Sequence, residues 1–409
     1  MNYYRHNNHK FMPPSKVYND DPSLMFVNAG MNQIKDVFLG KAEPKSTELM
    51  NYQICLRAGG KHNDLDDVGR DSYHLTTFEM LGSWSLNSYD RKTAITLAYG
   101  FLTNIMKLDR DRLYITYYEG NNDIGEDVET RDIWKDIVEP NKIIKGSPED
   151  NLWKMADEGP CGMSTEIHYD LIGGRDASTL VNCDDPTVVE IWNIVFTEYN
   201  QVGNEYLPLG KLFIDTGMGL ERLSMIVNNK PTLYHTDAFT YLIGYAQAMS
   251  GCVGFSDKYD GNMIDVSYRI FSDHMRTVVN ALFDGVEFGN NKRGHVLKKV
   301  FRRCLTHYYV YLNNKTAEPV MHKPIVTCMI TDILTYFLKM KHDPIQIQTQ
   351  LINDEKMYLG KLYNSKKGYK RLCKKFPPEI VTQKLKQEFG VDPEIIECLD
   401  TMEFKMEGK

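Results

Sequence analysis

The chain has 409 residues and 42% of them are hydrophobic, which is enough to bury a core and to build two domains. Its formal net charge is −7, so any surface that binds nucleic acid must be local rather than a property of the whole chain. The eight cysteines lie far apart without a C-x-x-C pair, which argues against a zinc site and for reduced thiols in the cytoplasm. No apolar run approaches the roughly 18 residues of a membrane span, so we expect neither a membrane segment nor a signal peptide.

The N-terminal part of the chain is predicted to form strands around one long polar loop. In chain order we expect a loop or short helix at residues 1–21, a helix at 34–39, strands at 52–56 and 74–80, a helix at 93–106 and a strand at 112–118. Arg57 follows the first of these strands and Phe78 lies on the second, with Gly, Asn and Asp residues crowded between them. A fixed guanidinium can grip a phosphate beside a ring that stacks on a base, but the pattern is equally typical of a surface hairpin.

Residues 151–170 form the next dense patch of the sequence. Trp153 and Met155 can line an apolar pocket, and the glycines at residues 159–162 predict a tight turn beneath it. Three polar residues alternate on the strand that is predicted to follow: Glu166, His168 and Asp170. Such a row can hold a metal, but a polar row on a half-exposed strand is the commoner meaning.

A central buried strand is predicted at residues 188–199, because the run is nearly continuous and rich in β-branched residues. A further strand at residues 212–214 is predicted to end in a glycine-rich turn that enters a helix. Gly217 and Gly219 allow a ligand to approach the backbone, and Arg222 lies about one helical turn away. A plain strand-to-helix turn fits the same residues. Neither a G-x-x-x-x-G-K-[ST] phosphate loop nor a complete G-x-G-x-x-G pattern is present.

A series of longer motifs runs in one order along the first 300 residues of the chain. They are NAGMNQIKDVFLG at 28–40, the stretch at 55–86, GPCG at 159–162, EIHYD at 166–170, GGRDAS at 173–178, EIWNIVF at 190–196, DTGMGLER at 215–222, SDHMRT at 272–277 and NKRGHVLKKVFRR at 291–303. Together they resemble the alanyl-tRNA synthetases, a class II aminoacyl-tRNA synthetase family, and GGRDAS is more similar to the eukaryotic, cytosolic form. The resemblance implies an α+β fold: an antiparallel sheet flanked by helices over residues 1–240, then an all-helical domain over 241–409 that recognises the tRNA acceptor stem.

The resemblance also implies roles for individual residues. For ATP, Arg57 would hold the α-phosphate, Phe78 would stack on adenine, and Arg222 would cover the other face of the base and reach the γ-phosphate, with Gly219 beside it. For alanine, Arg57 would hold the carboxylate and Asp215 the α-ammonium. The remaining alanine-binding residues would shape a pocket for one methyl group: Met80, Trp153, Asn193, Val195 and Gly217. Glu190 would be a ligand of Mg²⁺. No protein nucleophile is needed, because positioning and charge neutralisation by the arginines and Mg²⁺ account for most of the acceleration.

Helices are predicted in the second half at residues 268–283, 295–311, 324–339 and 344–376, with a short one near 392. Two basic clusters repeat at helical spacing: Lys292, Arg293, Lys298, Lys299, Arg302 and Arg303, then Lys366, Lys367, Lys370, Arg371, Lys374 and Lys375. Solvated faces are the usual meaning of such runs, but beside an aminoacylation core we favour contacts with acceptor-stem phosphates. The family reads a G·U pair there with an asparagine and an aspartate. Asn290, or its neighbour Asn291, matches the asparagine, whereas Gln387 stands where the aspartate is expected.

We therefore expect a cytoplasmic alanine–tRNA ligase that uses ATP and Mg²⁺, holds no structural zinc, and binds alanine and the tRNA(Ala) acceptor stem. The sequence ends before the editing and C-terminal domains of full-length members, so we expect a monomer that mischarges glycine and serine unless another protein clears the errors. A methyl group discriminates by only roughly 1–3 kcal/mol. One alternative is a paralogue that transfers its aminoacyl-adenylate to an acceptor other than tRNA. Another is a non-catalytic tRNA-binding relic, against which Arg57, Phe78, Asp215 and Arg222 argue.

Overall fold

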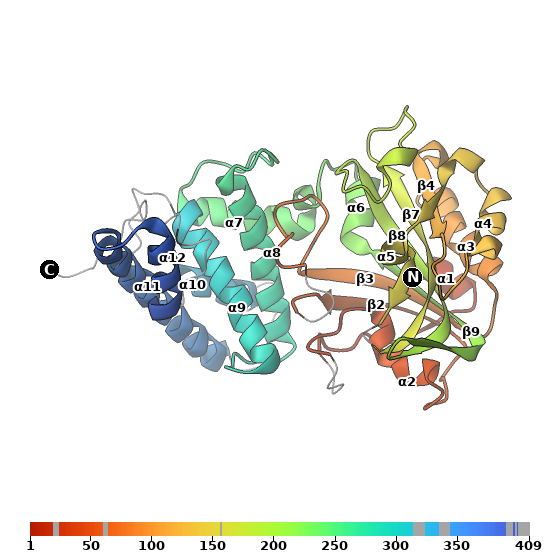
Figure 1. Ribbon diagram of the computed structural model, residues 1–409, viewed down its shortest axis with the longest axis horizontal. Coiled ribbons are helices and arrows are strands. Elements are labelled where there is room, and N and C mark those ends of the chain that lie inside the picture. The colour runs from red at the N-terminus through yellow and green to blue at the C-terminus, as the bar shows by residue number, and fades with distance from the viewer. Residues whose placement is uncertain are drawn as a thin grey trace. The chain divides into compact units, whose positions relative to one another are not determined.

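The computed structural model describes residues 1–18, 24–59, 64–155, 158–313, 324–334 and 344–389, together with residues 396 and 399. The chain forms two compact units, which Figure 1 shows as a sheet with its helices and as a group of helices. Unit 1 comprises Met1–Asp64 and Thr77–Thr236, and unit 2 comprises Leu65–Thr76 and Asp237–Lys409. The division at Thr236 lies close to the boundary expected from the sequence, but the polar loop Leu65–Thr76 belongs to unit 2.

Unit 1 is built on one mixed sheet that is mainly antiparallel. Among the described residues its strands are β1 (Lys10–Phe11), β2 (Glu48–Leu56), β3 (Thr77–Leu86), β4 (Leu113–Tyr118), β5 (Ile143–Gly146), β6 (Leu152–Lys154), β7 (Gly159–Asp170), β8 (Val188–Val202) and β9 (Glu205–Gly219). Their order across the sheet is β1-β2-β3-β9-β8-β7-β4-β5, with β6 paired to β7. Only the outer pairs β1–β2 and β4–β5 are parallel. The sheet predicted from the sequence is confirmed, with the β-branched run at residues 188–199 as the inner strand β8.

Short helices flank this sheet: α1 (Asn2–His6), α2 (Lys35–Phe38), α3 (Arg91–Gly100), α4 (Val128–Lys135), α5 (Pro148–Asn151) and α6 (Leu220–Val227). Figure 1 shows α3 and α4 together beside the β4 end of the sheet, where α3 contacts β8 and α4 contacts β4. Carboxylate caps begin both helices, since Asp90 accepts the Thr93 N–H at 2.8 Å and Asp127 accepts the Thr130 N–H at 3.1 Å. One apolar cluster under the sheet joins Met31, Phe38, Trp84, Met155 and Phe213.

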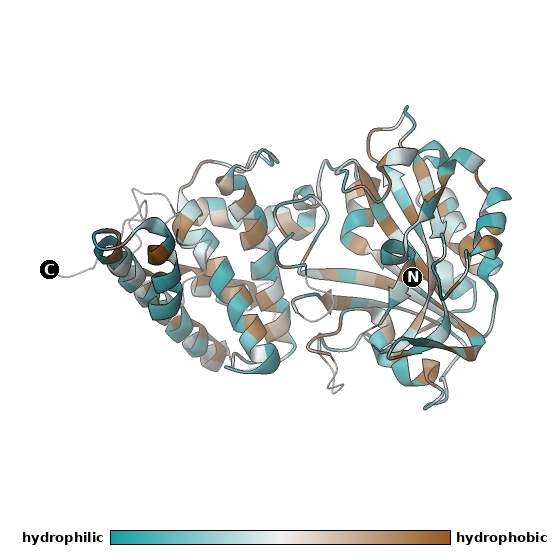
Figure 2. Cartoon of the chain, in the orientation of Figure 1, coloured by the Kyte–Doolittle hydropathy of each residue, from teal (hydrophilic) through white to brown (hydrophobic). Residues whose placement is uncertain are grey.

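Unit 2 is helical, as predicted: α7 (Asp237–Ser250), α8 (Met263–Phe283), α9 (Lys292–Thr306), α10 (Ile325–Asp332), α11 (Pro344–Cys373) and α12 (Pro378–Phe389). Proline opens α11 and α12, where its missing N–H costs no hydrogen bond. The helix α8 is buried around most of its circumference and packs against α7 and α9. Figure 2 shows hydrophobic and hydrophilic positions alternating around α9, as an amphipathic helix requires. The sequence did not predict α12, and the short helix expected near residue 392 lies outside the described residues.

The tight turn predicted at residues 159–162 is wrong, because a strand begins there, and the strand predicted to end at residue 214 continues through Gly217. Gly159–Asp170 forms β7. The strand β9 (Glu205–Gly219) ends at Gly219 and α6 begins at Leu220, so the predicted passage from strand to helix is present. Gly162 lies at a register shift where a Cβ would stand 1.9 Å from the carbonyl oxygen of Phe196, so glycine is needed for close strand approach. The second strand begins at Thr77 rather than at residue 74, because residues 74–76 belong to the loop bound by unit 2.

Candidate active site

Three neighbouring strands bring the predicted pocket residues onto one face of the sheet. Across β3 and β9, Met80 pairs with Gly219, Gly82 with Gly217, and Trp84 with Asp215. Across β9 and β8, Gly217 pairs with Asn193 and Asp215 with Val195. Paired residues in a sheet point to the same side, so all of these residues share one face. Residues that are far apart in the sequence therefore line one site.

Asp215 is the buried acid of this face. The indole Nε1 of Trp84 donates a hydrogen bond to Asp215 Oδ1 at 2.5 Å. Burial raises the pKa of Asp215 to about 7, although the hydrogen bond from Trp84 acts in the opposite direction. Because burial makes ionisation of Asp215 unfavourable, a cation bound beside it would stabilise the charged carboxylate. Trp84 was not predicted from the sequence as part of the site, although it lies four residues after Met80 on the same face of β3.

Glycines determine the space around these two side chains. The indole of Trp84 fits because Cβ atoms at Gly30 and Gly82 would lie 2.9 and 2.3 Å from its ring carbons. A Cβ at Gly217 would lie 2.9 Å from the Sδ of Met80. The side chain of Met80 therefore covers Gly217 and leaves no room for a side chain at that position. Trp153 pairs with Gly162 on β7, and it packs with Met80 against the Trp84 cluster. Met80, Trp153 and the indole of Trp84 therefore form an apolar wall on the face of the sheet that carries Asp215.

Arg57 and Phe78 lie at the neighbouring ends of β2 and β3. The guanidinium Cζ of Arg57 stands 5.0 Å from the ring centroid of Phe78, and both side chains are partly exposed. Arg57 Nε donates to the carbonyl oxygen of Asn28 at 3.4 Å. The turn that carries Asn28 is held by Asn32, whose Oδ1 accepts the N–H groups of residues 28 and 29 at 2.9 and 3.0 Å. A guanidinium and a ring at this separation suit a phosphate and a base.

Arg222 lies in the first turn of α6 and binds β8. Its Nη1 donates to the carbonyl oxygen of Glu190 at 2.8 Å and to its Oε2 at 3.0 Å. Burial raises the pKa of Glu190, but the charges of Arg222, His168 and Arg57 outweigh burial and leave the pKa below its usual value. The charged Glu190 is thus available as one oxygen ligand. The preceding residue on α6, Glu221, was missed from the sequence: its carboxylate accepts the Glu79 N–H at 3.0 and 3.1 Å and ties α6 to β3 beside Phe78.

A metal site made by protein side chains alone is not present in the described part of the chain. No group of three or more His, Cys, Asp or Glu side chains there could hold a metal ion. The row that the sequence suggested as a metal site is used differently, since Asp170 binds Arg175 at 2.7 Å and His168 binds Glu166 at 3.1 Å. The seven cysteines among the described residues are all free of disulfides. The expectation that the protein holds no structural zinc stays a prediction.

The predicted tRNA-binding residues of α9 fall into two groups. Lys298 and Arg303 bind protein groups: Lys298 Nζ forms an ion pair with Asp354 at 2.6 Å, and Arg303 Nη1 donates to the Leu65 carbonyl at 2.6 Å. The other predicted residues are exposed or partly exposed at the start of α9 and along one side of it: Asn290, Arg293, Lys299 and Arg302. The charge of Lys298 is already neutralised, so this residue is a weaker candidate for a phosphate contact than Lys299.

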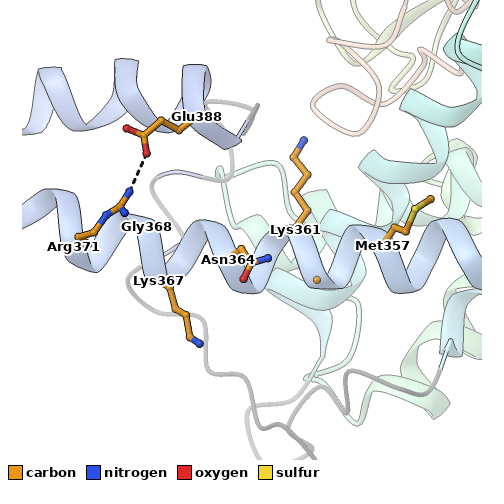
Figure 3. A pocket seen from close by; sticks show the side chains of 8 residues that line it. Met357, Lys361, Asn364, Lys367, Gly368, Arg371 and Glu388 are labelled. Atoms are coloured by element: carbon orange, nitrogen blue, oxygen red, sulfur yellow. Dashed lines mark hydrogen bonds and ion pairs between the residues drawn. The ribbon is translucent and has the colours of Figure 1, made fainter.

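Four residues of the second basic cluster lie on α11, and Lys374 and Lys375 follow its last residue, Cys373. A hollow of about 700 Å³ runs over this helix, and Lys361, Lys367 and Arg371 are among the residues that line it. Figure 3 shows these side chains on one helix, with Arg371 joined to Glu388 of α12 by an ion pair of 2.9 Å. Gln387, which takes the place of the family's aspartate, is exposed on α12.

Within unit 2, side chains of α8 and α9 form hydrogen bonds with both ends of the loop Leu65–Thr76. Asp273 accepts the Thr76 N–H at 2.9 Å and pairs with His274 Nδ1 at 2.9 Å, while His274 Nε2 lies 3.1 Å from Arg303 Nη1. The middle of the loop is held by Arg269, whose Nε donates to the Gly69 carbonyl at 2.8 Å. The motif SDHMRT thus has a structural role in fixing this loop, which joins β2 to β3.

No helix among the described residues is long and apolar enough to span a membrane. The family model described as tRNA synthetases class II (A) matches residues 1–403. The chain is 40% identical to the cytoplasmic alanine–tRNA ligase of Dictyostelium discoideum over 90% of this chain and 40% of that protein. It is 43% identical to the mitochondrial alanine–tRNA ligase of Saccharomyces cerevisiae over 84% of this chain and 36% of that protein.

Apo histidyl-tRNA synthetase of S. aureus superposes on 56% of this chain and 63% of its own, with a TM-score of 0.33 and 9% identity, which is too distant to inform the site. The chain spans about 40% of the length of the curated relatives that it matches. The resemblance drawn from the motifs is confirmed by the family match over almost the whole chain and by identities near 40%. This chain belongs to the tRNA synthetase class II (A) family.

Proposed function

We propose that this chain activates alanine with ATP and transfers the alanyl group to the 3′ end of tRNA(Ala). The observation that carries the proposal is the buried Asp215, which shares one face of the sheet with Met80, Gly217, Asn193 and Val195. The methyl group of alanine would lie against Met80, and the α-ammonium would face the carboxylate of Asp215. Larger side chains would clash with Met80 or Trp153. The names of the two relatives described above, both alanine–tRNA ligases, support the same amino acid.

The residues around the pocket suit the chemistry of adenylate formation. The alanine carboxylate must attack the α-phosphate of ATP, which requires the two anions to be brought together and their charge to be offset. In this proposal Arg57 binds both groups, Phe78 stacks on adenine, and Arg222, next to Gly219, reaches the outer phosphates from the other side. Asp215 would hold the ammonium, with Val195 and Asn193 beside it.

The site is compatible with a Mg²⁺ ion held mainly by the nucleotide. Mg²⁺ commonly takes one or two protein carboxylates and completes its shell with phosphate oxygens and water. Glu190 offers one charged carboxylate next to Arg222, at 3.0 Å from its guanidinium. When bound there, the ion would neutralise phosphate charge, while Arg222 and Glu190 would fix its place at the nucleotide.

The exposed basic residues of α9 support tRNA as the acceptor. We propose that Asn290, Arg293, Lys299 and Arg302 contact the acceptor stem, with Lys298 and Arg303 holding the helix in place. We also propose residues 1–240 as the aminoacylation domain, 241–409 as the acceptor-stem domain, a cytoplasmic location and a monomeric state. Gln387 favours a second candidate function, in which the adenylate is transferred to an acceptor other than tRNA, because it replaces the aspartate that the family uses on the G·U pair.

Alanine-dependent exchange of pyrophosphate into ATP tests the first step. We expect exchange with alanine, weaker exchange with serine and glycine, and none with valine, because the pocket excludes branched side chains. Exchange that is equally fast with valine would contradict the pocket, and absence of exchange with every amino acid would refute the proposed activity. A variant that keeps the fold but lacks the guanidinium, Arg57→Ala, serves as the negative control.

A further inference from the structure

Four side-chain positions form one row across the centre of the sheet. Gly82 on β3 pairs with Gly217 on β9, Gly217 pairs with Asn193 on β8, and Asn193 pairs with Glu166 on β7. Trp84 and Met80 occupy the space over the two glycines, so Asn193 carries the first side chain of this row that borders the proposed amino acid site. Glu166 lies directly behind Asn193. The row therefore places a buried carboxylate one strand away from the proposed amino acid site.

Glu166 is only 6% exposed, and its two carboxylate oxygens have different partners. Its Oε2 accepts from Asn182 Nδ2 at 3.0 Å, from His168 Nε2 at 3.1 Å and from Thr116 Oγ1 at 3.2 Å. Its Oε1 accepts from Asn193 Nδ2 at 3.3 Å. The Thr116 hydroxyl is the donor here, because its oxygen already accepts from Asn151 Nδ2 and from the Glu166 N–H. Four donors converge on one carboxylate, and only one of them comes from the pocket.

This arrangement fixes which end of the Asn193 amide meets Glu166. A carboxylate only accepts hydrogen bonds, so the NH₂ group of Asn193 must face it and the carbonyl oxygen must point elsewhere. That oxygen, Oδ1, is buried and has no hydrogen-bond partner among the residues that the structure describes. An unpaired buried acceptor is costly unless a ligand supplies a donor. Asp215, which pairs with Val195 two residues along β8, is its diagonal neighbour on the same face.

We propose that Glu166 is a positioning residue that orients Asn193 so that its Oδ1 accepts a hydrogen bond from the α-ammonium of the bound amino acid. Asp215 supplies the charge of this ammonium site and Asn193 supplies a second, neutral acceptor. The identity of the ligand as an α-amino acid rests on the proposed function. Glu166 itself does not touch the substrate.

The substitution Glu166→Gln tests the orientation because it keeps the size of the side chain and removes one acceptor. With one oxygen left, the introduced glutamine satisfies the three donors at the former Oε2 position and turns its NH₂ group toward Asn193. Asn193 must then flip, which presents its NH₂ group to the ammonium in place of its carbonyl oxygen. Asn182→Ala is the matched control, since it removes one partner of the same carboxylate without touching Asn193.

Binding of L-alanine by calorimetry and steady-state pyrophosphate exchange are measured on wild type, E166Q, N182A, N193A and E166Q/N193A. Loss of a hydrogen bond to a charged group predicts a rise of about tenfold or more in the alanine Kd and KM of E166Q and N193A. The KM for ATP should change by less than about twofold, and N182A should match wild type. E166Q should add nothing in the N193A background, because its effect passes through Asn193.

An E166Q variant with wild-type alanine Kd, or one that weakens alanine equally with and without Asn193, would overturn the positioning role. If E166Q does not fold, the alanine affinity of N193A becomes the test. An N193A variant that binds alanine as tightly as wild type would overturn the proposal. Wild-type protein that binds alanine but shows no exchange would refute the proposed activity while leaving the binding test of Glu166 intact. Wild-type protein that binds no alanine would overturn both.

Discussion

Asp215→Asn should stabilise the protein while it abolishes the proposed activity. The folded state holds Asp215 buried against Trp84 with a pKa of about 7, whereas the same group in the unfolded chain has its ordinary value near 3.8. Between these two values the unfolded state releases its proton and the folded state does not, so ionisation favours unfolding as the pH rises. The contribution of this group to stability is therefore highest at pH 3.8 and below, declines up to about pH 7 and is constant above it. The neutral amide of asparagine keeps an acceptor for Trp84 and removes this dependence.

The difference between about 7 and 3.8, at about 1.4 kcal/mol for each pH unit, gives the variant an advantage of up to ~4 kcal/mol at pH 8. Urea unfolding at pH 4.5, 7 and 8 measures it, with tryptophan fluorescence as the probe, because all four tryptophans of the chain lie in unit 1. The gain of D215N over wild type should be small at the lowest pH and largest at the highest.

The affinity for alanine should fall in the variant whose stability rises. The alanine KM of wild type should rise as the pH falls below about 7, because a protonated Asp215 no longer offers a charge to the ammonium. D215N should lose at least about tenfold in alanine affinity at every pH. A variant that is no more stable than wild type at pH 8, or whose advantage is the same at all pH values, would refute the reasoning. D215N with wild-type alanine affinity would refute the role of Asp215.

Three further changes test other parts of the site. Gly217→Ala should raise the alanine KM about tenfold or more and the glycine KM less, because its methyl group would press on Met80 Sδ from 2.9 Å; equal effects in exchange assays would contradict the pocket. Arg57→Lys should lower kcat/KM for ATP by about 100-fold, since an ammonium cannot hold two oxygens and stack beside Phe78; activity within about threefold of wild type would argue against that role. Asp273→Ala should cost ~1–3 kcal/mol of stability by removing the buried acceptor of the Thr76 N–H and of His274 Nδ1, and an unchanged helical unfolding transition in circular dichroism would contradict the loop clamp.

Local patterns were enough to predict most elements and to group the site residues through the family motifs. Apolar, β-branched and aromatic runs predicted the strands around Arg57, Phe78 and Asn193, and proline and helical spacing predicted α11. Glycine was the main source of error. At Gly162 and Gly217 the sequence indicated turns, whereas the structure uses glycine inside strands, where a neighbouring strand or Met80 leaves no room for a side chain. Local sequence does not distinguish these two uses, because the crowding comes from residues far away in the chain.

Long-range pairing accounts for the other differences. The loop Leu65–Thr76 looks like a plain connector in sequence, but its backbone donors and acceptors are met by α8 and α9 within unit 2. Periodicity placed Lys298 and Arg303 on a basic face, while contacts with Asp354 and Leu65 show that both side chains bind protein groups. Glu166 was considered only as part of a metal row, since its role behind Asn193 depends on a register that no single strand reveals.

Charging of tRNA(Ala) transcripts with radiolabelled alanine tests the central claim most directly, with the acceptor G·U pair either intact or changed to G·C. We expect ATP-dependent charging of the G·U transcript, and of the G·C transcript as well if Gln387 has replaced the family's pair-reading aspartate without a substitute. Absence of charging on both transcripts, while alanine-dependent pyrophosphate exchange proceeds, would contradict the assignment as a tRNA ligase and favour transfer to a different acceptor.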